Sequence, residues 1–291
     1  MKTNGFYWRN EGLSMFYDHE LGISSVLERL DGKIPNSQGI RKKNIRILMN
    51  TIIGNLQSAD FFLGQLNNNI MADQLLFGYW GIRGLGQSLR YYLEYLGLPY
   101  QDKRYVKPEE WFGEVAQAPL NNEVLVNLPY IKDGDKWIFE SGALYVYLAH
   151  KANRADLLGS TPEEQVTLAQ TKGVLQDLLK SFFTLITFSE EQYAAKKEEF
   201  FKTDILWLIE KLNAFLGGRQ WAAGNNLTYV DFQLFEVEET LKAFNIDTFN
   251  AQANLKKHHD EFSNIAQIKA YLGSDKFIAG PFYPPGAFRW G

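Results

Sequence analysis

Apolar residues between Gln74 and Ala149 change their spacing several times, which predicts strands alternating with helices. Leu75-Leu76-Phe77 is a short apolar run typical of a strand, and Gly78 follows it. Five apolar residues then repeat at helical spacing: Leu85, Leu89, Tyr92, Leu93 and Leu96. This spacing predicts an amphipathic helix, which we expect to end at Gly97 and Pro99.

A second strand and a hairpin follow this helix. Alternation over Gln101–Val106 predicts the strand. The hairpin is predicted between Tyr130 and Phe139, with Asp133-Gly134 as its turn. We expect Ser141 to cap a short helix that reaches Ala149, which completes a small α/β unit.

From Thr161 onward, the apolar residues follow helical spacing only. Four apolar faces are predicted: Leu175 to Ile186, Phe201 to Phe215, Val230 to Phe244, and Leu255 to Leu272. The pattern changes near residues 150–160, so we expect an α/β domain over residues 73–153 and a helical domain over residues 160–291.

The third of these helices has a well-marked start. Thr228 and Asp231 have the spacing of a capping box, in which each side chain bonds to the other residue's backbone N–H. Leu227 and Phe232 stand at the positions of a hydrophobic staple. We therefore expect a structural role for Asp231, not a catalytic one.

Residues 1–72 have a different composition and form an extension whose role the sequence does not assign. They are rich in Asn, Gly and Ser, with a basic cluster around Arg41–Arg46 and one predicted helix over Asn44–Leu66. No apolar stretch of secretory-signal length follows a basic start, and acids outnumber bases over residues 1–31, unlike in a transit peptide. An alternative is that Met71 begins the native protein.

Composition excludes several classes of function. The 30 Lys and Arg against 34 Asp and Glu give no electrostatic case for binding nucleic acid. The chain has no cysteine, and its four histidines lack zinc-ligand spacing, so we expect no metal. Because no stretch of 18 apolar residues occurs, we expect no membrane span. Any thiol chemistry must come from a ligand.

The segment Gly78–Gly86 follows the first strand and opens the first helix. Its glycines do not have the G-x-G-x-x-G spacing of a dinucleotide site. Tyr79, at the end of the predicted strand, would point its hydroxyl toward the carboxyl edge of the sheet, where α/β folds bind ligands.

Several dispersed motifs together resemble the mu-class glutathione transferases. They are Gly78-Tyr79-Trp80-x-Ile82-Arg83-Gly84-Leu85, Asn127-Leu128-Pro129-Tyr130, Glu140-Ser141, Trp221 to Asn225 running into Thr228-x-Val230-Asp231-Phe232, and the tail Phe288-Arg289-Trp290-Gly291. The resemblance covers roughly residues 73–291. It implies a thioredoxin-like N-terminal domain, an all-helical C-terminal domain and a cytoplasmic homodimer with glutathione as co-substrate.

The resemblance also gives roles to individual residues. Tyr79 would donate a hydrogen bond to the glutathione sulfur and lower the thiol pKa; a fall of about two units corresponds to ~2.7 kcal/mol. A cis Pro129 would present Leu128 and Asn127 to the cysteinyl part of glutathione, as in an added strand. Glu140 would face the γ-glutamyl ammonium, and Ser141 its carboxylate.

Further contacts are implied by the same resemblance. Trp80, Leu85 and Trp111 would enclose the peptide, and Asp177 would reach the γ-glutamyl amine across the dimer. A pocket for the electrophile is expected between the domains, lined by Leu85, the Leu175–Phe188 helix and the C-terminal tail. Three aromatic residues of that helix are candidates for its wall: Phe182, Phe183 and Phe188.

Two departures from the family pattern concern binding. No Lys or Arg occurs between Trp111 and Lys132, where the family places basic residues for the glycine carboxylate. Lys103, Arg104 and Lys107 are candidate replacements. Leu125 stands where the family uses an aromatic residue at the dimer contact.

The expected function is addition of the glutathione thiolate to hydrophobic electrophiles, without a protein nucleophile or a metal. Two alternatives remain open. One is a non-catalytic structural or binding protein of the same fold, and the other is a glutathione-dependent isomerase or peroxidase. Retention of Tyr79, Pro129, Glu140 and Ser141 favours an enzyme.

Overall fold

The computed structural model describes residues 9–10, 13–14, 74–115 and 124–283, and the chain divides into two units, Met1–Ile70 and Met71–Gly291. In the first unit, β1 (Arg9–Asn10) pairs antiparallel with β2 (Leu13–Ser14). The basic cluster and the helix predicted over residues 44–66 lie outside the described residues.

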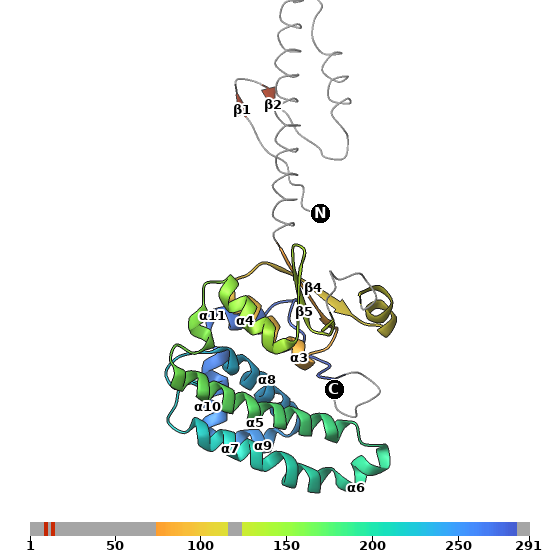
Figure 1. Ribbon diagram of the computed structural model, residues 1–291, viewed down its shortest axis with the longest axis vertical. Helices are drawn as coiled ribbons and strands as arrows, with labels where there is room; N and C mark the ends of the chain where they lie inside the picture. Colours follow the sequence, from red (N-terminus) through yellow and green to blue (C-terminus); the bar gives the residue numbers. More distant parts are fainter. Residues whose placement is uncertain (1–8, 11–12, 15–73, 116–123, 284–291) are drawn as a thin grey trace, which may run out of the picture. The chain divides into compact units, whose positions relative to one another are not determined.

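A four-stranded mixed sheet forms the start of the second unit (Figure 1). Its strands are β3 (Leu75–Trp80), β4 (Tyr100–Tyr105), β5 (Tyr130–Asp133) and β6 (Lys136–Phe139), in the order β4-β3-β5-β6. Strand β4 runs parallel to β3, whereas β5 is antiparallel to both β3 and β6. This is the predicted thioredoxin-like arrangement of strand, helix, strand and hairpin.

Strand β3 is longer than its apolar run predicts. Gly78 lies inside the strand because the ring of Tyr130 packs directly on it: a Cβ added there would be 2.2 Å from a Tyr130 ring carbon. Tyr79 is therefore the penultimate strand residue. The hairpin loop is Gly134-Asp135, since Asp133 still pairs with Lys136.

Helices α3 (Gly84–Leu96) and α4 (Ser141–Lys151) contact each other and the sheet. Gly97 ends α3 in the left-handed conformation, with φ of 64°, as the sequence predicts. The expected cap of α4 is wrong by one residue. Glu140 occupies the cap position with φ of 69°, and Ser141 is the first helical residue.

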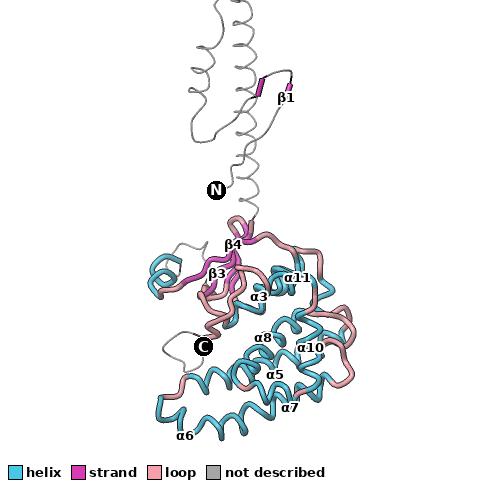
Figure 2. Tube along the Cα trace, turned by 180° about the vertical axis from the view of Figure 1, so that it is seen from behind, coloured by secondary structure: helices cyan, strands magenta, loops and turns pink. Residues whose placement is uncertain are grey.

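The rest of the second unit is helical (Figure 2). Two short turns, η1 (Glu110–Val115) and η2 (Ala155–Leu158), precede α5 (Pro162–Ile186), α6 (Glu190–Phe200), η3 (Phe201–Leu206), α7 (Trp207–Leu216), α8 (Tyr229–Phe244), α9 (Ile246–Ala251), α10 (Ala253–Ser263) and α11 (Ala266–Leu272). None of the helices in the described part of the chain is long and apolar enough to cross a bilayer.

The fourth predicted helical face belongs to two helices, α10 and α11, not one. Asn264 ends α10, and Ile265 adopts an extended backbone before α11 begins. Ser and Asn are poor helix formers, so the chain turns at Ser263-Asn264 while Ile268 still reaches the core.

The sheet and the helices share a hydrophobic core. Rings from α8 and α10 belong to the same buried cluster as the sheet residues, including Phe232, Phe235 and Phe262. Tyr92 of α3 meets Phe232 at 4.9 Å, and Tyr91 meets Phe235 at 5.2 Å between ring centroids. A second cluster fills the space between α5, α7 and α8. The position of α3 is thus fixed by the helical domain as well as by the sheet.

Asp231 organises the start of α8. Its carboxylate accepts the Thr228 N–H at 2.7 Å and the Thr228 hydroxyl at 2.8 Å, within the predicted capping box. It also accepts the Ala222 N–H at 2.7 Å and lies 3.2 Å from Nε2 of His258. Because Asp231 is fully buried, these bonds are what make its charge tolerable in the core.

His258 lies between two carboxylates in the core, those of Asp231 and Glu238. Its Nδ1 is 2.9 Å from Glu238, on the side opposite Asp231. Burial opposes a charge on the imidazole, but the carboxylates of Glu238 and Asp231 outweigh it and raise the pKa of His258 to about 10. The folded protein therefore holds His258 as a cation at neutral pH.

Replacing Asp231 by alanine should lower the free energy of unfolding by about 3–5 kcal/mol, because it leaves two buried backbone N–H groups and Nε2 of the His258 imidazolium without their acceptor. Urea unfolding measures this loss. The matched control is Asp156→Ala, which breaks an exposed pair with Arg154 and should cost at most about 1 kcal/mol. Similar losses in the two variants would contradict the role assigned to Asp231.

His258 should make stability fall at alkaline pH. Its folded pKa of about 10 lies above the unfolded value of 6.5, so its contribution is complete below pH 6.5 and is lost as pH rises toward 10. Urea unfolding of the wild type and of His258→Gln across this window measures it. We expect the difference in unfolding free energy between the two proteins to shrink with rising pH; a constant difference would refute the assignment.

Candidate active site

A cavity of about 390 Å³ opens where the end of β3, the start of α3, α5, α8 and the segment Phe282-Tyr283 meet. Its lining is mostly apolar: Trp80, Ile82, Leu85, Leu179, Phe183 and Phe282 contribute, together with Tyr79. Tyr79 is buried, whereas Leu85 and Phe183 are exposed. The cavity therefore runs from a closed end at Tyr79 to an open, apolar mouth.

The Tyr79 hydroxyl has a defined donor and a free direction for its own proton. Its oxygen accepts the N–H of Leu85 at 3.0 Å. Burial raises the pKa of Tyr79, although the Leu85 N–H and the charge of Arg90 act against this rise. The phenol is thus protonated at neutral pH and can donate its O–H to an acceptor in the cavity.

Two glycines allow the Tyr79 ring to lie against the first turn of α3. A Cβ at Gly86 would be 2.3 Å from Cδ1 of Tyr79, and one at Gly84 would be 2.7 Å from its hydroxyl. Gly84 also has φ of 39°, which disfavours any other residue. The tyrosine and the helix start therefore form one close-packed unit.

Arg90 holds the loop that joins β3 to α3. Its buried guanidinium donates to the carbonyl oxygens of Ile82 at 3.0 Å and Trp80 at 3.3 Å. Its Nε pairs with Asp102 of β4 at 2.9 Å. These bonds tie the loop beside Tyr79 to the neighbouring strand.

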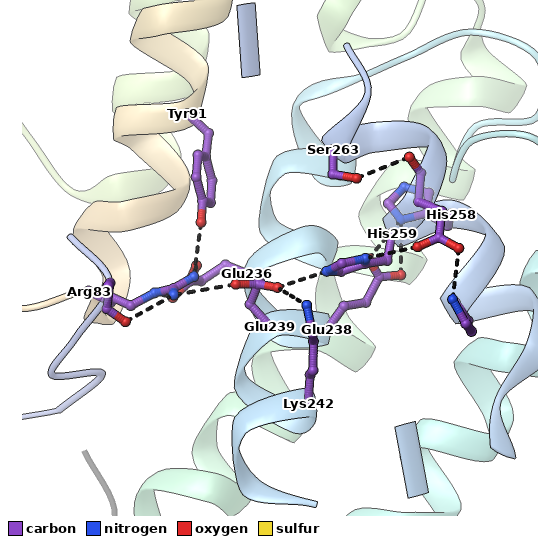
Figure 3. A network of polar contacts seen from close by, with 12 residues as sticks. Arg83, Tyr91, Glu236, Glu238, Glu239, Lys242, His258, His259 and Ser263 are labelled. Atoms are coloured by element: carbon purple, nitrogen blue, oxygen red, sulfur yellow. Dashed lines mark hydrogen bonds and ion pairs between the residues drawn. The ribbon is translucent and has the colours of Figure 1, made fainter. Parts of the chain in front are cut away.

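Arg83, in the same loop, forms a buried ion pair with Glu236 of α8 (Figure 3). Its Nε and Nη2 lie 3.0 and 2.7 Å from the two carboxylate oxygens, and Nη2 also donates to Tyr91 at 2.9 Å. The Phe282 ring stacks on the guanidinium at 4.2 Å. This pair joins the loop to the helical domain.

The segment Pro281-Phe282 pairs with the same loop through the backbone. The N–H of Arg83 donates to the Pro281 carbonyl, and that of Gly84 to the Phe282 carbonyl, each at 2.9 Å. These two bonds place Phe282 and Tyr283 in the cavity wall.

A second group of polar residues surrounds the start of α4. Asn127 donates to Glu140 at 3.1 Å, and its oxygen accepts the Leu128 N–H at 2.9 Å. The Leu128-Pro129 bond is cis, as the mu-class resemblance implies. The Ala143 and Leu144 N–H groups bond to the Glu140 carbonyl, so those of Ser141 and Gly142 precede the helical ladder.

The Lys172 ammonium reaches this helix start from α5. A Cβ at Gly142 would lie only 3.1 Å from its Nζ. A cation beside a helix N-terminus is unfavourable unless an anion joins them, because the N-terminal dipole is also positive. Ser141, Gly142 and Lys172 together form a surface suited to a carboxylate.

Comparison with known proteins decides the family. A model of the glutathione S-transferase N-terminal domain matches residues 76–150, and one of the C-terminal domain matches residues 176–275. Glutathione S-transferase 2 of Gallus gallus is 32% identical over 71% of this chain and 93% of its own length. Glutathione S-transferase Mu 2 of Mus musculus is also 32% identical, over 74% of this chain and 97% of its own length. The chain belongs to the glutathione S-transferase family.

Solved structures agree with this assignment. The glutathione S-transferase Blo t 8 superimposes with a TM-score of 0.62 at 25% identity, over 74% of this chain and 99% of that chain. The pi-class glutathione S-transferase of Onchocerca volvulus has a TM-score of 0.58 at 22% identity, over 68% of this chain and 92% of that chain. The second likeness supports the fold alone.

The structure of this glutathione transferase brings most of the predicted site residues together in two groups. Tyr79, Trp80 and Leu85 line the cavity. The predicted polar residues cluster at the start of α4: Asn127, Leu128, Pro129, Glu140 and Ser141.

Two predicted residues lie elsewhere. Trp111 is 4% exposed and stacks on Tyr130 at 5.9 Å, so it belongs to the core of the sheet domain. Asp177 is exposed on α5. Among the three candidate aromatic residues of α5 and its end, Phe183 lines the cavity, Phe182 is fully buried, and Phe188 packs on Phe200.

The candidate basic replacements differ in their availability. Arg104 is already paired with Asp102 at 2.7 Å and donates to the Lys276 carbonyl. Lys103 lies over the Tyr105 ring at 5.3 Å, and Lys107 is exposed. Lys103 and Lys107 therefore remain the candidates for the glycine carboxylate.

Sequence reasoning missed several residues of the site. It did not single out Lys172 or Lys180, because a lysine on a helix carries no local signal of what it faces. The Arg83–Glu236 pair joins residues that are 153 positions apart. The tight spacing of Gly84 and Gly86 after Tyr79 was the one visible clue to the close packing there.

Replacing Gly86 by alanine should lower the free energy of unfolding by about 1–3 kcal/mol, because the new Cβ collides with the Tyr79 ring. Alanine otherwise favours helix, so Gly173→Ala is a matched control. Gly173 lies inside α5 with open space around it, and its replacement should raise stability by up to ~1 kcal/mol. Chemical denaturation checks both, and shifts of the same sign would contradict the packing argument.

Proposed function

We propose that this glutathione transferase conjugates the thiolate of glutathione to hydrophobic electrophiles bound in the Tyr79 cavity. The observation that carries the proposal is the Tyr79 hydroxyl itself. It is buried at the closed end of an apolar cavity, accepts a hydrogen bond from Leu85, and keeps its own proton for a ligand.

Tyr79 would act by donating its O–H to the sulfur of bound glutathione. A hydrogen bond to the charged form favours that form, so the thiol pKa falls and thiolate accumulates near neutral pH. The thiolate then attacks the electrophilic carbon, the new C–S bond forms, and the leaving group departs with the bonding electrons. No covalent bond to the protein is needed.

The second polar group would hold the peptide part of glutathione. In this proposal, the Leu128 backbone pairs with the cysteinyl residue, and Asn127 releases the Leu128 N–H to do so. Ser141 and the start of α4 hold the γ-glutamyl carboxylate, with Lys172 as an added cation. Glu140 faces the γ-glutamyl ammonium.

The remaining predicted contacts stay part of the proposal. Trp80, Leu85 and Trp111 would enclose the peptide: Trp80 and Leu85 line the cavity, and Trp111 packs on Tyr105, which contacts Trp80. Asp177 is exposed and would contact the glutathione of a second protomer in a homodimer. The homodimer and the cytoplasmic location are both carried over from the mu-class resemblance.

We further propose the domain division that the sequence predicts. Residues 73–153 would bind glutathione, residues 160–291 would complete the electrophile site, and residues 1–72 would be an extension outside both. The family models, which match residues 76–150 and 176–275, and the division of the chain after Ile70 support this.

Replacing Tyr79 by phenylalanine in the full chain should lower kcat/KM for conjugation of 1-chloro-2,4-dinitrobenzene at least tenfold, since it removes the donor to sulfur. Glutathione affinity, measured by calorimetry, should change little. Thiolate absorbance across pH should show a higher thiol pKa in the variant. The control is Tyr100→Phe in β4, whose hydroxyl bonds to Glu94 of α3 and lies outside the cavity lining.

The outcomes separate the alternatives. Full activity in Tyr79→Phe would remove Tyr79 from the mechanism. A wild type that binds glutathione yet conjugates nothing would favour a glutathione-dependent isomerase or peroxidase. Absence of glutathione binding in a folded wild type would leave only a non-catalytic structural protein.

A further inference from the structure

Two ionic side chains line the cavity among the described residues, Lys180 of α5 and Glu236 of α8. The rest of the lining is apolar apart from the hydroxyls of Tyr79, Thr240 and Tyr283. A single unpaired charge in such a wall would decide which co-substrates bind well. Substrate preference therefore depends on whether each of these two side chains is already paired within the protein.

Glu236 is already neutralised. It is buried, and both of its carboxylate oxygens bond to the guanidinium of Arg83, at 3.0 and 2.7 Å. A carboxylate that is paired in this way attracts a cationic group of a ligand only weakly. Nearby Glu239 is likewise engaged, by His259 at 2.7 Å and by Arg83 at 3.5 Å.

Lys180 has no such partner. None of the ion pairs or side-chain hydrogen bonds found within residues 74–115 and 124–283 involves its ammonium group. It is exposed, and α5 contributes the apolar side chains of Leu179 and Phe183 to the same cavity wall. Beside an apolar wall, the attraction between an ammonium and an anion is stronger than in open water, because fewer water molecules screen it.

The two ends of the cavity differ in burial, and this gives a ligand an orientation. Tyr79 is 6% exposed, whereas Phe183 is 53% and Leu85 46% exposed. The reacting carbon belongs at the Tyr79 end. An attached charged group would then point to the open end, where Lys180 lies.

We propose that the preferred co-substrates are hydrophobic electrophiles that carry an anionic group, such as a carboxylate, on the side away from the reacting carbon, and that Lys180 binds this group. The inference rests on the function proposed above and names the substrate class of that same cavity. Lys180 acts here as a specificity determinant, and Tyr79 retains the chemistry.

The test uses a matched pair of chloroarenes with the full chain, 4-chloro-3-nitrobenzoate and its neutral amide. Replacing Lys180 by methionine keeps the aliphatic stem and removes the charge. We expect kcat/KM for the benzoate to fall about tenfold and that for the amide to stay within about twofold. Lys180→Glu should reverse the preference. Lys196→Met, at an exposed position of α6, is the charge-matched control and should change neither value.

Salt gives an independent check, because it screens an exposed charge pair. At saturating glutathione, added salt should reduce kcat/KM for the benzoate in the wild type and leave that for the amide unchanged. Equal losses on both substrates in Lys180→Met, or no loss on either, would overturn the proposal. A wild type that conjugates the amide but not the benzoate would overturn it as well, with the proposed function intact. Failure to conjugate either substrate or 1-chloro-2,4-dinitrobenzene would overturn both.

Discussion

The buried ion pair between Arg83 and Glu236 is the interaction on which the site depends. It joins the loop that follows Tyr79 to α8, across the boundary between the sheet domain and the helical domain. Removal of either partner would leave an unpaired buried charge, at a cost of about 3–5 kcal/mol. The Phe282 ring stacks on the guanidinium of Arg83, and the backbone of Pro281-Phe282 is hydrogen-bonded to the same loop. The loop beside Tyr79 and the wall that faces Tyr79 thus share one anchor.

Besides Glu236, helix α8 holds Glu238 and Glu239, and each is paired with residues of other elements (Figure 3). Glu236 faces Arg83, Glu238 faces His258, and Glu239 contacts both His259 and Arg83. Each carboxylate has a cationic or hydrogen-bonding partner on another element, which is why a buried helix can hold so many acids. Since α8 also supplies Phe232 and Phe235 to the core of the sheet domain, that core extends into the helical domain, which has a second cluster of its own.

The sequence predicted what depends on local periodicity. The β3–α3–β4 unit, the hairpin, the cap at Gly97 and the box at Thr228 all follow from residues close in the chain, and each was found. The errors lie where tertiary packing overrides local preference. Gly78 stays in β3 because Tyr130 packs on it, and Glu140 takes the cap position that Ser141 was expected to hold. Trp111 was assigned to the glutathione site from the resemblance; its ring packs on Tyr105 and Tyr130, and its role in that site stays a prediction.

Burial explains why a tyrosine suits the closed end of this cavity. The same desolvation that raises the pKa of Tyr79 keeps it protonated, and only a protonated phenol can donate to sulfur. The Leu85 N–H polarises the phenol oxygen without taking its proton, so the hydroxyl is oriented and still available. A thiolate formed there gains a hydrogen bond in a place where water competes poorly. The apolar mouth lined by Leu85 and Phe183 then binds hydrophobic electrophiles beside that sulfur. For catalysis, the protein therefore needs to position the two substrates and to supply one hydrogen-bond donor, and it needs no nucleophile of its own.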